Sequence, residues 1–221
     1  MKTANISPNR LLSWRSKGKK MKIFAKKKKD NCREIYFLNF MIYRYSKKCK
    51  TKTQYDGLRY VQYCRFLRLL HYFMKPKIYV EVGVAFGNSL IMADKSTKVI
   101  GIDPVNRLKY PLAENCQIFF ETSDDFFARH NIVKEFHAPV DLAFLDGMHL
   151  FEYYLRDFIN LEKNSHKDTV IVIHDTTPVD EVSSMRERKQ DFWTGDVFKM
   201  VLILKKYRPD LKIINIDERS E

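Results

Sequence analysis

Residues 78–89 read IYVEVGVAFGNS, and this stretch decides the fold class. Ile78 to Val82 is a short apolar run of β-branched and aromatic side chains, which is typical of a buried strand. Gly83 and Gly87 bracket the turn that follows, where glycine permits backbone angles closed to most residues. Asn88 to Asp94 then has the character of the opening turns of a helix. A strand, a glycine turn and a helix in this order predict the first unit of an α/β domain.

The same alternation continues toward the end of the chain. Further strands are predicted over residues 98–102, 117–120, 140–145, 169–173 and 211–216, and further helices over residues 55–74, 123–136, 151–162 and 195–207. Ser123 is expected to be the N-cap of its helix. Nearly unbroken apolar strands between amphipathic helices indicate a mostly parallel sheet with helices on both faces. We therefore predict a Rossmann-like, doubly wound α/β fold.

Charge divides the chain into two parts. The net charge is +13, yet residues 1–77 hold 22 Lys and Arg against three acidic residues, a net of +19, whereas the remaining 18 basic and 24 acidic residues give −6. We predict a basic, helical N-terminal extension over residues 1–54 and the α/β domain over residues 55–221. The extension is densest at Lys26 to Lys29. It is either a solvated tail or a surface for nucleic acid or an anionic membrane.

Composition disfavours several classes of protein. The four cysteines show no CxxC spacing and no paired histidines nearby, which argues against a zinc cluster or a disulfide framework and suits a reducing cytoplasm. The first 30 residues contain no apolar segment of a signal peptide. The most apolar early run, residues 35–43, contains Asn39 and is about half the length that spans a bilayer. We expect a cytoplasmic protein that is at most peripheral at a membrane surface.

Acidic residues gather at the predicted strand ends. In a parallel sheet the carboxyl ends of the strands share one edge, and ligands bind there. That edge would carry Glu81, Asp103, Asp146 and Asp175. The turn lacks the GxGxxG spacing that cradles a pyrophosphate, and the Glu81 carboxylate would repel phosphates. Carboxylates suit a cationic ligand instead, and S-adenosylmethionine carries an ammonium group and a sulfonium but no phosphate.

The residue types also suggest contacts with the rest of such a cofactor. Asp103 follows Gly83 by 20 residues, where a carboxylate accepts hydrogen bonds from both ribose hydroxyls. Ser123 and Asp124 suit the adenine edge, although helix capping explains both nearly as well.

A cation and a base are suggested by the next two strand ends. Asp146 and Asp175 end neighbouring strands, so with Thr176 they suit Mg²⁺; alternatively, one carboxylate positions the cofactor and the other caps a loop. His149, three residues after Asp146, suits a general base, although a single histidine is more often structural. We interpret His174 as mainly structural.

These motifs resemble those of the class I S-adenosylmethionine-dependent methyltransferases. The matching segments are residues 80–89, 101–104, 144–149 and 171–176, and the resemblance covers about residues 76–217. The Asp-Gly-x-His element at Asp146 and the His-Asp-Thr element at His174 are similar to the methyltransferase-24-type domain, which is related to the catechol and caffeoyl-coenzyme A O-methyltransferases. The stretch Trp193 to Val197 is similar to members of this group as well.

The resemblance implies a role for each matching residue. It implies that the methionine part is held by Glu81 and the loop of Gly83, Gly87 and Ser89, that Asp103 holds the ribose, and that Ser123 with Asp124 borders the adenine. In metal-dependent relatives the positions of Asp146 and Asp175 bind the cation, and the position of His149 is a lysine base. Histidine replaces that lysine here, and Thr176 stands where asparagine is usual, so the base and the metal requirement stay open. Family members also add a seventh, antiparallel strand after residues 211–216.

We therefore predict O-methylation of a small-molecule or glycan hydroxyl, with His149 as the base and Asp146 orienting the cofactor or a cation. One alternative is an RNA methyltransferase that uses the basic extension, although the chain has no Asn-Pro-Pro-Tyr motif and no cysteine beside a proline. Another is a catalytically inactive module that binds a membrane surface. A sheet without its seventh strand also suggests an edge covered by a second subunit, that is, a homo-oligomer.

Overall fold

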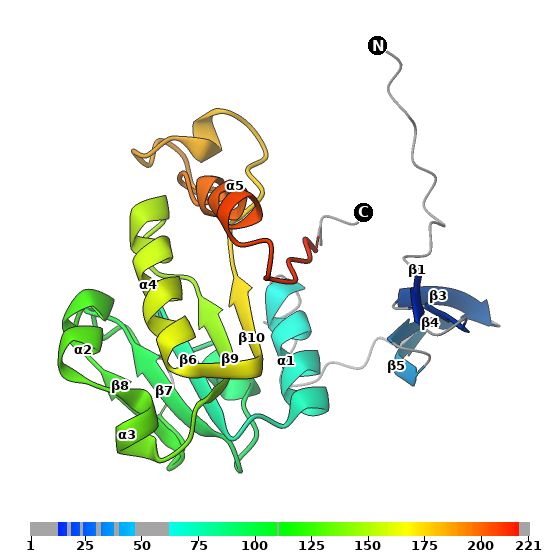
Figure 1. Cartoon of the computed structure of the whole chain (residues 1–221), viewed down its shortest axis with the longest axis horizontal. Helices are drawn as coiled ribbons and strands as arrows, with labels where there is room; N and C mark the ends of the chain where they lie inside the picture. Colours follow the sequence, from blue (N-terminus) through cyan, green and yellow to red (C-terminus); the bar gives the residue numbers. More distant parts are fainter. Residues whose placement is uncertain are drawn as a thin grey trace. The chain divides into compact units, whose positions relative to one another are not determined.

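The computed structural model describes residues 62–109 and 111–216, together with the backbone of short strands within residues 13–46. The chain divides into two compact units, Met1–Tyr60 and Val61–Glu221 (Figure 1). Each unit is considered by itself.

The described backbone of the first unit is extended. Strands β1 (Ser13–Ser16) and β2 (Lys19–Lys22) form an antiparallel pair, and β3 (Phe24–Lys29), β4 (Cys32–Phe37) and β5 (Phe40–Ser46) form an antiparallel sheet in that order. The prediction of a helical extension is wrong for these segments. Aromatic and β-branched residues are dense in β4 and β5, and such side chains favour a pleated strand over a helix. The remainder of the predicted extension lies outside the described residues.

The second unit is built on a five-stranded parallel sheet, which confirms the predicted parallel arrangement for five of the six predicted strands. Its strands are β6 (Ile78–Val82), β7 (Lys98–Ile102), β8 (Cys116–Phe119), β9 (Val140–Leu145) and β10 (Ser165–Ile173). Their order across the sheet is β10-β9-β6-β7-β8 (Figure 1). The order changes direction at β6, which is where ligands bind in open α/β sheets.

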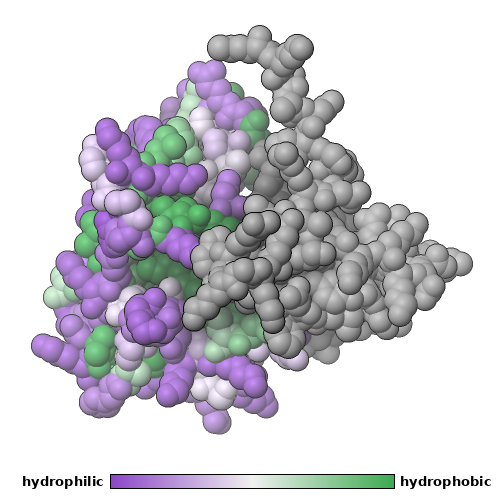
Figure 2. Space-filling model, turned by 45° about the vertical axis from the view of Figure 1, so that its right-hand side comes forward, coloured by the Kyte–Doolittle hydropathy of each residue, from purple (hydrophilic) through white to green (hydrophobic). Residues whose placement is uncertain are grey.

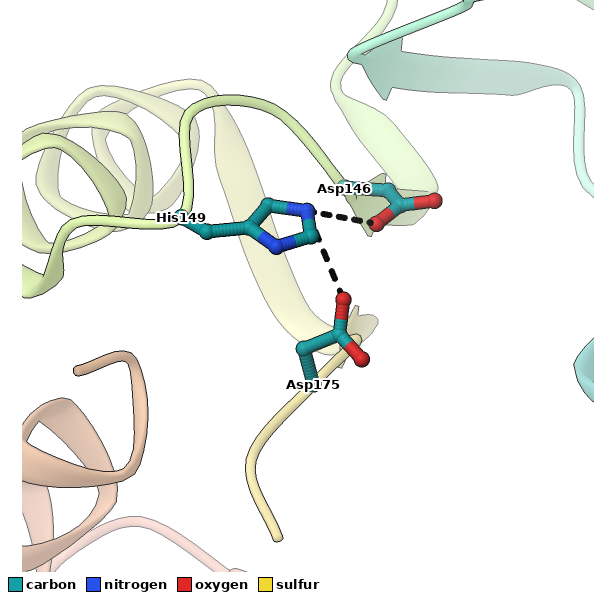
Figure 3. A group of neighbouring side chains, drawn as sticks. All are labelled: Asp146, His149 and Asp175. Atoms are coloured by element: carbon teal, nitrogen blue, oxygen red, sulfur yellow. Dashed lines mark ion pairs between the residues drawn. The ribbon is translucent and has the colours of Figure 1, made fainter. Parts of the chain in front are cut away.

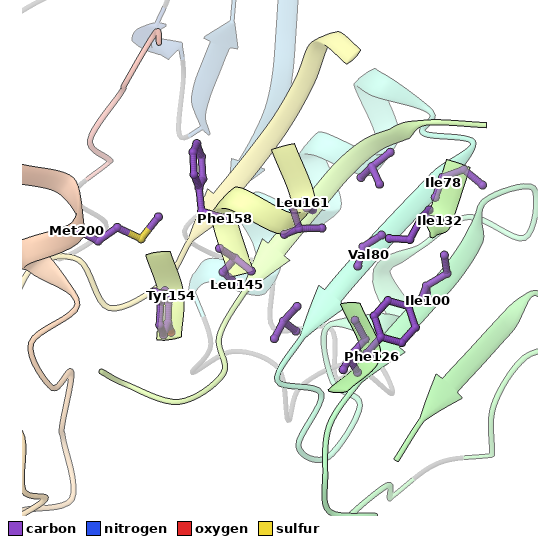
Figure 4. Close-up of a cluster of buried hydrophobic side chains, with 14 of the residues drawn as sticks. Ile78, Val80, Ile100, Phe126, Ile132, Leu145, Tyr154, Phe158, Leu161 and Met200 are labelled. Carbon is purple, nitrogen blue, oxygen red and sulfur yellow. The ribbon is translucent and has the colours of Figure 1, made fainter. Parts of the chain in front are cut away.

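Helices cover both faces of this sheet. They are α1 (Gln62–Met74), α2 (Ser123–Arg129), α3 (Ile132–Phe136), α4 (Phe151–Lys163) and α5 (Phe198–Tyr207). One core cluster joins alternate strand residues such as Val80 to Phe126 of α2, Leu161 of α4 and Met200 of α5 (Figure 4). The other joins the opposite strand face to Leu67 of α1. The doubly wound prediction is confirmed.

Three local predictions differ from the structure. Asn88 to Asp94 forms only a short 3₁₀ turn, η2 (Leu90–Met92). The helix predicted over residues 123–136 is broken between α2 and α3, because Asn131 is the N-cap of a new helix and accepts a hydrogen bond from the Lys134 N–H. Its first N-cap is Thr122, which accepts a hydrogen bond from the Asp125 N–H, whereas Ser123 is the first residue inside α2.

The predicted strand over residues 211–216 is also wrong. This segment has no regular structure and pairs with no strand among the described residues. Leu211 and Ile213 pack against the core cluster, whereas Ile214 and Ile216 are exposed. Leu211 and Ile213 are half-buried, and the Leu211 N–H donates to the Arg208 carbonyl at 3.1 Å, so the segment contacts the core without pairing as a strand.

The visible face of the second unit carries both hydrophilic and hydrophobic residues. Figure 2 shows polar residues over most of the visible face, with a smaller hydrophobic area among them. In the part of the chain that the structure describes, no helix has the length and apolar character needed to cross a bilayer.

Candidate active site

Four carboxylates lie at one edge of the sheet. Glu81 is in β6, Asp103 follows β7, Asp146 follows β9, and Asp175 lies just beyond β10. These four strands are neighbours, in the order β10-β9-β6-β7. The sequence prediction that the acids share one edge is confirmed.

The Glu81 carboxylate is fully buried among hydroxyl groups. The Tyr79 hydroxyl donates to Oε2 at 2.7 Å, and the Ser89 hydroxyl donates to Oε1. Burial raises the pKa of Glu81, the two hydroxyl donors lower it, and the charges of Asp146 and Asp103 raise it, to about 8 overall. Among the described residues this carboxyl has hydroxyl partners and no ion pair, and its role in binding a cationic ligand stays a prediction.

Asp103 ties the glycine turn to the end of β7. Its Oδ2 accepts hydrogen bonds from the backbone N–H groups of Val84 and Ala85 at 3.0 and 2.9 Å, and its Oδ1 accepts one from Val105 at 2.9 Å. A carboxylate has about four acceptor positions, so three are already used. A ribose contact at Asp103 stays a prediction, with one position left for it.

The glycine turn lies in close contact with the backbone at the end of β9. Gly83 has φ +89°, and a Cβ there would lie 2.0 Å from the carbonyl oxygen of Asp146. Gly87 has φ +79° and donates its N–H to the Val84 carbonyl at 2.9 Å. Both glycines therefore occupy conformations that other residues rarely adopt, and Gly83 holds two of the acidic strand ends together.

The two residues predicted to contact adenine, Ser123 and Asp124, form contacts with side chains of α4. Asp124 forms a two-pronged salt bridge with Arg156 at 2.9 and 2.7 Å, which lowers the pKa of this exposed carboxyl. Burial raises the pKa of Asp157 to about 6, although a hydrogen bond with the Ser123 side chain lowers it. Contacts of Ser123 and Asp124 with adenine stay predictions.

His149 is held in one orientation by the segment that follows β10. Its Nδ1 lies 2.8 Å from the Trp193 carbonyl oxygen, and since a carbonyl only accepts, Nδ1 carries the hydrogen. The two rings stack, with centroids 5.1 Å apart. Gly195 has φ +58°, and a Cβ there would lie 1.8 Å from the His149 carbonyl oxygen. The imidazole Nε2 thus faces the acidic edge.

The Nε2 atom of His149 points between two carboxylates (Figure 3). It lies 3.7 Å from Oδ1 of Asp146 and 3.4 Å from Oδ2 of Asp175. Burial lowers the pKa of His149, but the hydrogen bond and charges of these acids outweigh it and raise the pKa above its usual value. Burial raises the pKa of Asp146, and the two nearby histidines reverse this and lower it.

His174, which sequence reasoning took as mainly structural, is part of the site. Its Nδ1 donates to Oδ1 of Asp146 at 3.0 Å and lies 3.1 Å from Oδ2 of Asp175. Burial lowers the pKa of His174, but hydrogen bonds with both acids raise it to about 10. Its position directly after a strand and before Asp175 is the only signal in the sequence. Trp193 was noted as part of a motif, but its contact with His149 joins residues 44 positions apart and has no local signature.

Comparisons with known proteins agree with this geometry. Residues 80–176 match the family model described as a methyltransferase domain. Similar solved structures include cofactor-bound Rv0187 from MTB, with 15% identity over 67% of this chain and 69% of that chain and a TM-score of 0.53. A putative O-methyltransferase from Klebsiella pneumoniae has 15% identity, coverages of 67% and 70%, and a TM-score of 0.51.

A third similar structure is the SAH-bound methyltransferase PaMTH1 from Podospora anserina, with 13% identity, coverages of 66% and 70%, and a TM-score of 0.51. No curated protein matches the chain. At these identities the structures establish the fold alone, and the family match is a likeness over residues 80–176. Residues 80–176 are similar to a methyltransferase domain, which agrees with the family that the sequence motifs resemble.

Proposed function

We propose that this domain transfers the methyl group of S-adenosylmethionine to a hydroxyl group of a small-molecule or glycan acceptor. The observation that carries the proposal is the acidic edge of the sheet, where Glu81, Asp103 and Asp146 converge without a basic side chain paired to Glu81 or Asp103 among the described residues. Such an edge attracts a cationic ligand and repels the pyrophosphate of a dinucleotide.

The residues present fit the cofactor. Glu81 is a buried carboxylate that gains from a cation, which suits the ammonium of the methionine part. The Gly83–Ser89 turn has a positive φ at both of its glycines, and the Ser89 hydroxyl donates to Glu81. Asp103 is the candidate for the ribose, and Ser123 with Asp124 for the adenine. When bound, the cofactor supplies an activated methyl group, so the protein contributes alignment and proton removal.

His149 is the proposed base. Because the Trp193 carbonyl keeps a hydrogen on Nδ1, Nε2 is the nitrogen that takes the acceptor's hydroxyl proton when the ring is neutral. The acceptor oxygen then forms its bond to the methyl carbon as the carbon–sulfur bond breaks and its electrons go to sulfur. Asp146 and Asp175 stabilise the imidazolium that results. A cationic ligand on the same edge lowers the pKa of His149, which keeps more of it in the basic form.

Mg²⁺ does not suit the donor set at this site. The ion prefers near-octahedral oxygen ligands. Asp146 and Asp175 supply the carboxylates, yet two imidazoles contact the same oxygens. We therefore assign no step to a cation.

The test compares His149→Ala and Asp146→Ala with the unmodified chain. Radiolabelled S-adenosylmethionine is offered with a panel of sugar and phenol acceptors, with and without EDTA. Loss of a base typically costs about 10²–10⁴-fold in rate, so we expect His149→Ala to fall in that range while cofactor affinity is largely kept. Asp146→Ala should lose both rate and affinity. Full activity in both variants would end this assignment.

A further inference from the structure

The imidazole of His174 lies between the two carboxylates that the sequence marks as a cation site. Its Nδ1 lies 3.0 Å from Oδ1 of Asp146 and 3.1 Å from Oδ2 of Asp175. Carboxylate oxygens only accept hydrogen bonds, so Nδ1 carries a hydrogen that faces both acids. The single N–H group of His174 is therefore shared by the carboxylates of Asp146 and Asp175, which lie at nearly the same distance from it.

Packing keeps the His174 ring in this position. The ring of Tyr63 lies against it, with centroids 4.5 Å apart, and Phe144 meets it edge-on at 5.9 Å. Tyr63 and Phe144 also stack on each other at 5.4 Å. The backbone N–H of His174 donates to the Leu145 carbonyl at 3.0 Å, which continues the pairing of β10 with β9. The ring cannot leave the carboxylates without disturbing this aromatic group.

The second acid is also fixed relative to the ring. Asp175 has φ +56°, in the left-handed region that few residues other than glycine adopt. This backbone turn brings its Oδ2 back toward Nδ1 of His174 and to 3.4 Å from Nε2 of His149. The two carboxylates are thus contacted by nitrogen on two sides.

We propose that methyl transfer by this protein needs no divalent cation, because the N–H of His174 takes the place of the ion in holding Asp146 and Asp175. The inference rests on the proposed function for its relevance to catalysis, but it makes a separate statement about cation binding. In this arrangement His174 is a positioning residue. It orients the two acids that face His149 and does not itself touch the acceptor.

Binding of a divalent cation between the two carboxylates would contradict this proposal. Asp146, His149 and Asp175 offer ligand atoms that all lie within 4.8 Å of one another, a spacing that an ion can bridge. Cation binding must therefore be measured directly on the full chain, after EDTA treatment and dialysis. Isothermal titration with MgCl₂ and MnCl₂, and the electron paramagnetic resonance of Mn²⁺, both report binding without requiring activity.

The decisive variant is His174→Phe. Phenylalanine keeps an aromatic ring beside Tyr63 and Phe144 but removes the N–H, so both carboxylates lose their shared donor. We expect no saturable Mg²⁺ or Mn²⁺ site in the unmodified chain and one site in the variant, at least tenfold tighter than any residual binding. The matched control is His166→Phe, which removes an imidazole 3.0 Å from the single acid Asp141 and should create no site.

Two results of these titrations would overturn the proposal. A stoichiometric Mg²⁺ or Mn²⁺ site in the unmodified chain that Asp175→Asn abolishes would overturn it, and so would a folded His174→Phe that gains no site. If circular dichroism shows that His174→Phe is unfolded, His174→Leu, which also has no side-chain donor, is measured in its place against the same expectation. Titration of S-adenosylmethionine into the unmodified chain separates the two proposals, because failure of cofactor binding contradicts the proposed function and leaves the cation result standing.

Discussion

A Cβ atom on Gly83 would lie 2.0 Å from the carbonyl oxygen of Asp146, so the ends of β6 and β9 touch through a position that only glycine can fill. The glycine turn and the Asp-Gly-x-His element are separated by more than 60 residues in the sequence. This contact is what joins the cofactor loop to the proposed catalytic residues.

Gly83→Ala should therefore damage both stability and cofactor binding. Overpacking typically costs about 1–3 kcal/mol, and a left-handed conformation adds about 1–2 kcal/mol for a residue with a Cβ. Urea unfolding should show a loss of about 3 kcal/mol. The control is Gly87→Ala, whose Cβ would meet only the flexible Leu108 side chain, at 3.1 Å, and should cost about 1 kcal/mol. Equal losses in the two variants would contradict the contact.

Cofactor binding should release a proton from Glu81. The pKa of this carboxyl is about 8 in the free protein, so it is mostly protonated at pH 7, and a bound ammonium group favours its ionised form. Affinity should accordingly rise as the pH increases from about 6 toward 8. Isothermal titration in two buffers of different ionisation enthalpy measures the proton count. Glu81→Gln should bind more weakly and release no proton; a pH-independent affinity in the unmodified chain would refute the role of Glu81.

His71 should make the protein sensitive to mild acid. It is buried, both ring nitrogens lack a hydrogen-bond partner, and its ring meets Tyr79 edge-on at 4.6 Å. Burial lowers its pKa from 6.5 to about 4, although the charge of Asp94 raises it. The folded state disfavours the charged ring, so the stability linked to His71 is complete above pH 6.5 and is lost as the pH falls toward 4.

The variant that tests this is His71→Leu. The fall in the His71 pKa from 6.5 to about 4 corresponds to a loss of about 3 kcal/mol in the free energy of unfolding between pH 6.5 and pH 4. Thermal unfolding at pH 7 and pH 4.5 should show a smaller loss in the variant than in the unmodified chain, with the variant also more stable at pH 7. Identical pH profiles would show that His71 is not the titrating group.

Asp196 should anchor the segment that positions His149. Its buried carboxylate accepts hydrogen bonds from Arg186 at 2.7 Å, Lys199 at 2.9 Å and the Phe151 N–H at 2.9 Å. Arg186 and Lys199 are about half exposed and can be hydrated, so the main loss is the charged hydrogen bond to the Phe151 N–H, and such a bond typically contributes about 1.5–3 kcal/mol. Asp196→Ala should approach that loss and slow methyl transfer by loosening Trp193.

The matched control for this anchor is the exposed pair of Asp124 and Arg156. Exposed salt bridges are worth up to about 1 kcal/mol, so Asp124→Ala should change the free energy of unfolding little. Urea unfolding of both variants makes the comparison. A similar small effect at Asp196 would mean that the segment is held by other contacts.

The fold could be predicted largely because its signals are local. Apolar strands such as Ile78–Val82 and the acids at their ends lie close together in the sequence, and the parallel topology then places those ends on one edge. The errors have equally local causes. Thr122 and Ser123 both suit an N-cap, and only the backbone conformation separates them. The apolar pattern at residues 211–216 indicated a strand, but pairing depends on a neighbour that the pattern does not specify.

The site was predicted less completely because its contacts are distant in sequence. Asp146 and His149 follow one strand and were predicted as a pair. The hydrogen bond from His149 to Trp193 and the position of His174 between two acids depend on how three segments meet. A histidine in a strand has the same local pattern whether it packs in a core or contacts carboxylates.

A competition titration shows whether the acidic edge of the sheet binds a cationic adenosyl ligand. The full chain is titrated with S-adenosylmethionine, S-adenosylhomocysteine and NAD⁺ in the same buffer. We expect one site for each adenosyl ligand, with binding weakened at least tenfold by Glu81→Gln, and no saturable binding of NAD⁺. Binding of NAD⁺ at this edge in place of the adenosyl ligands would contradict this expectation.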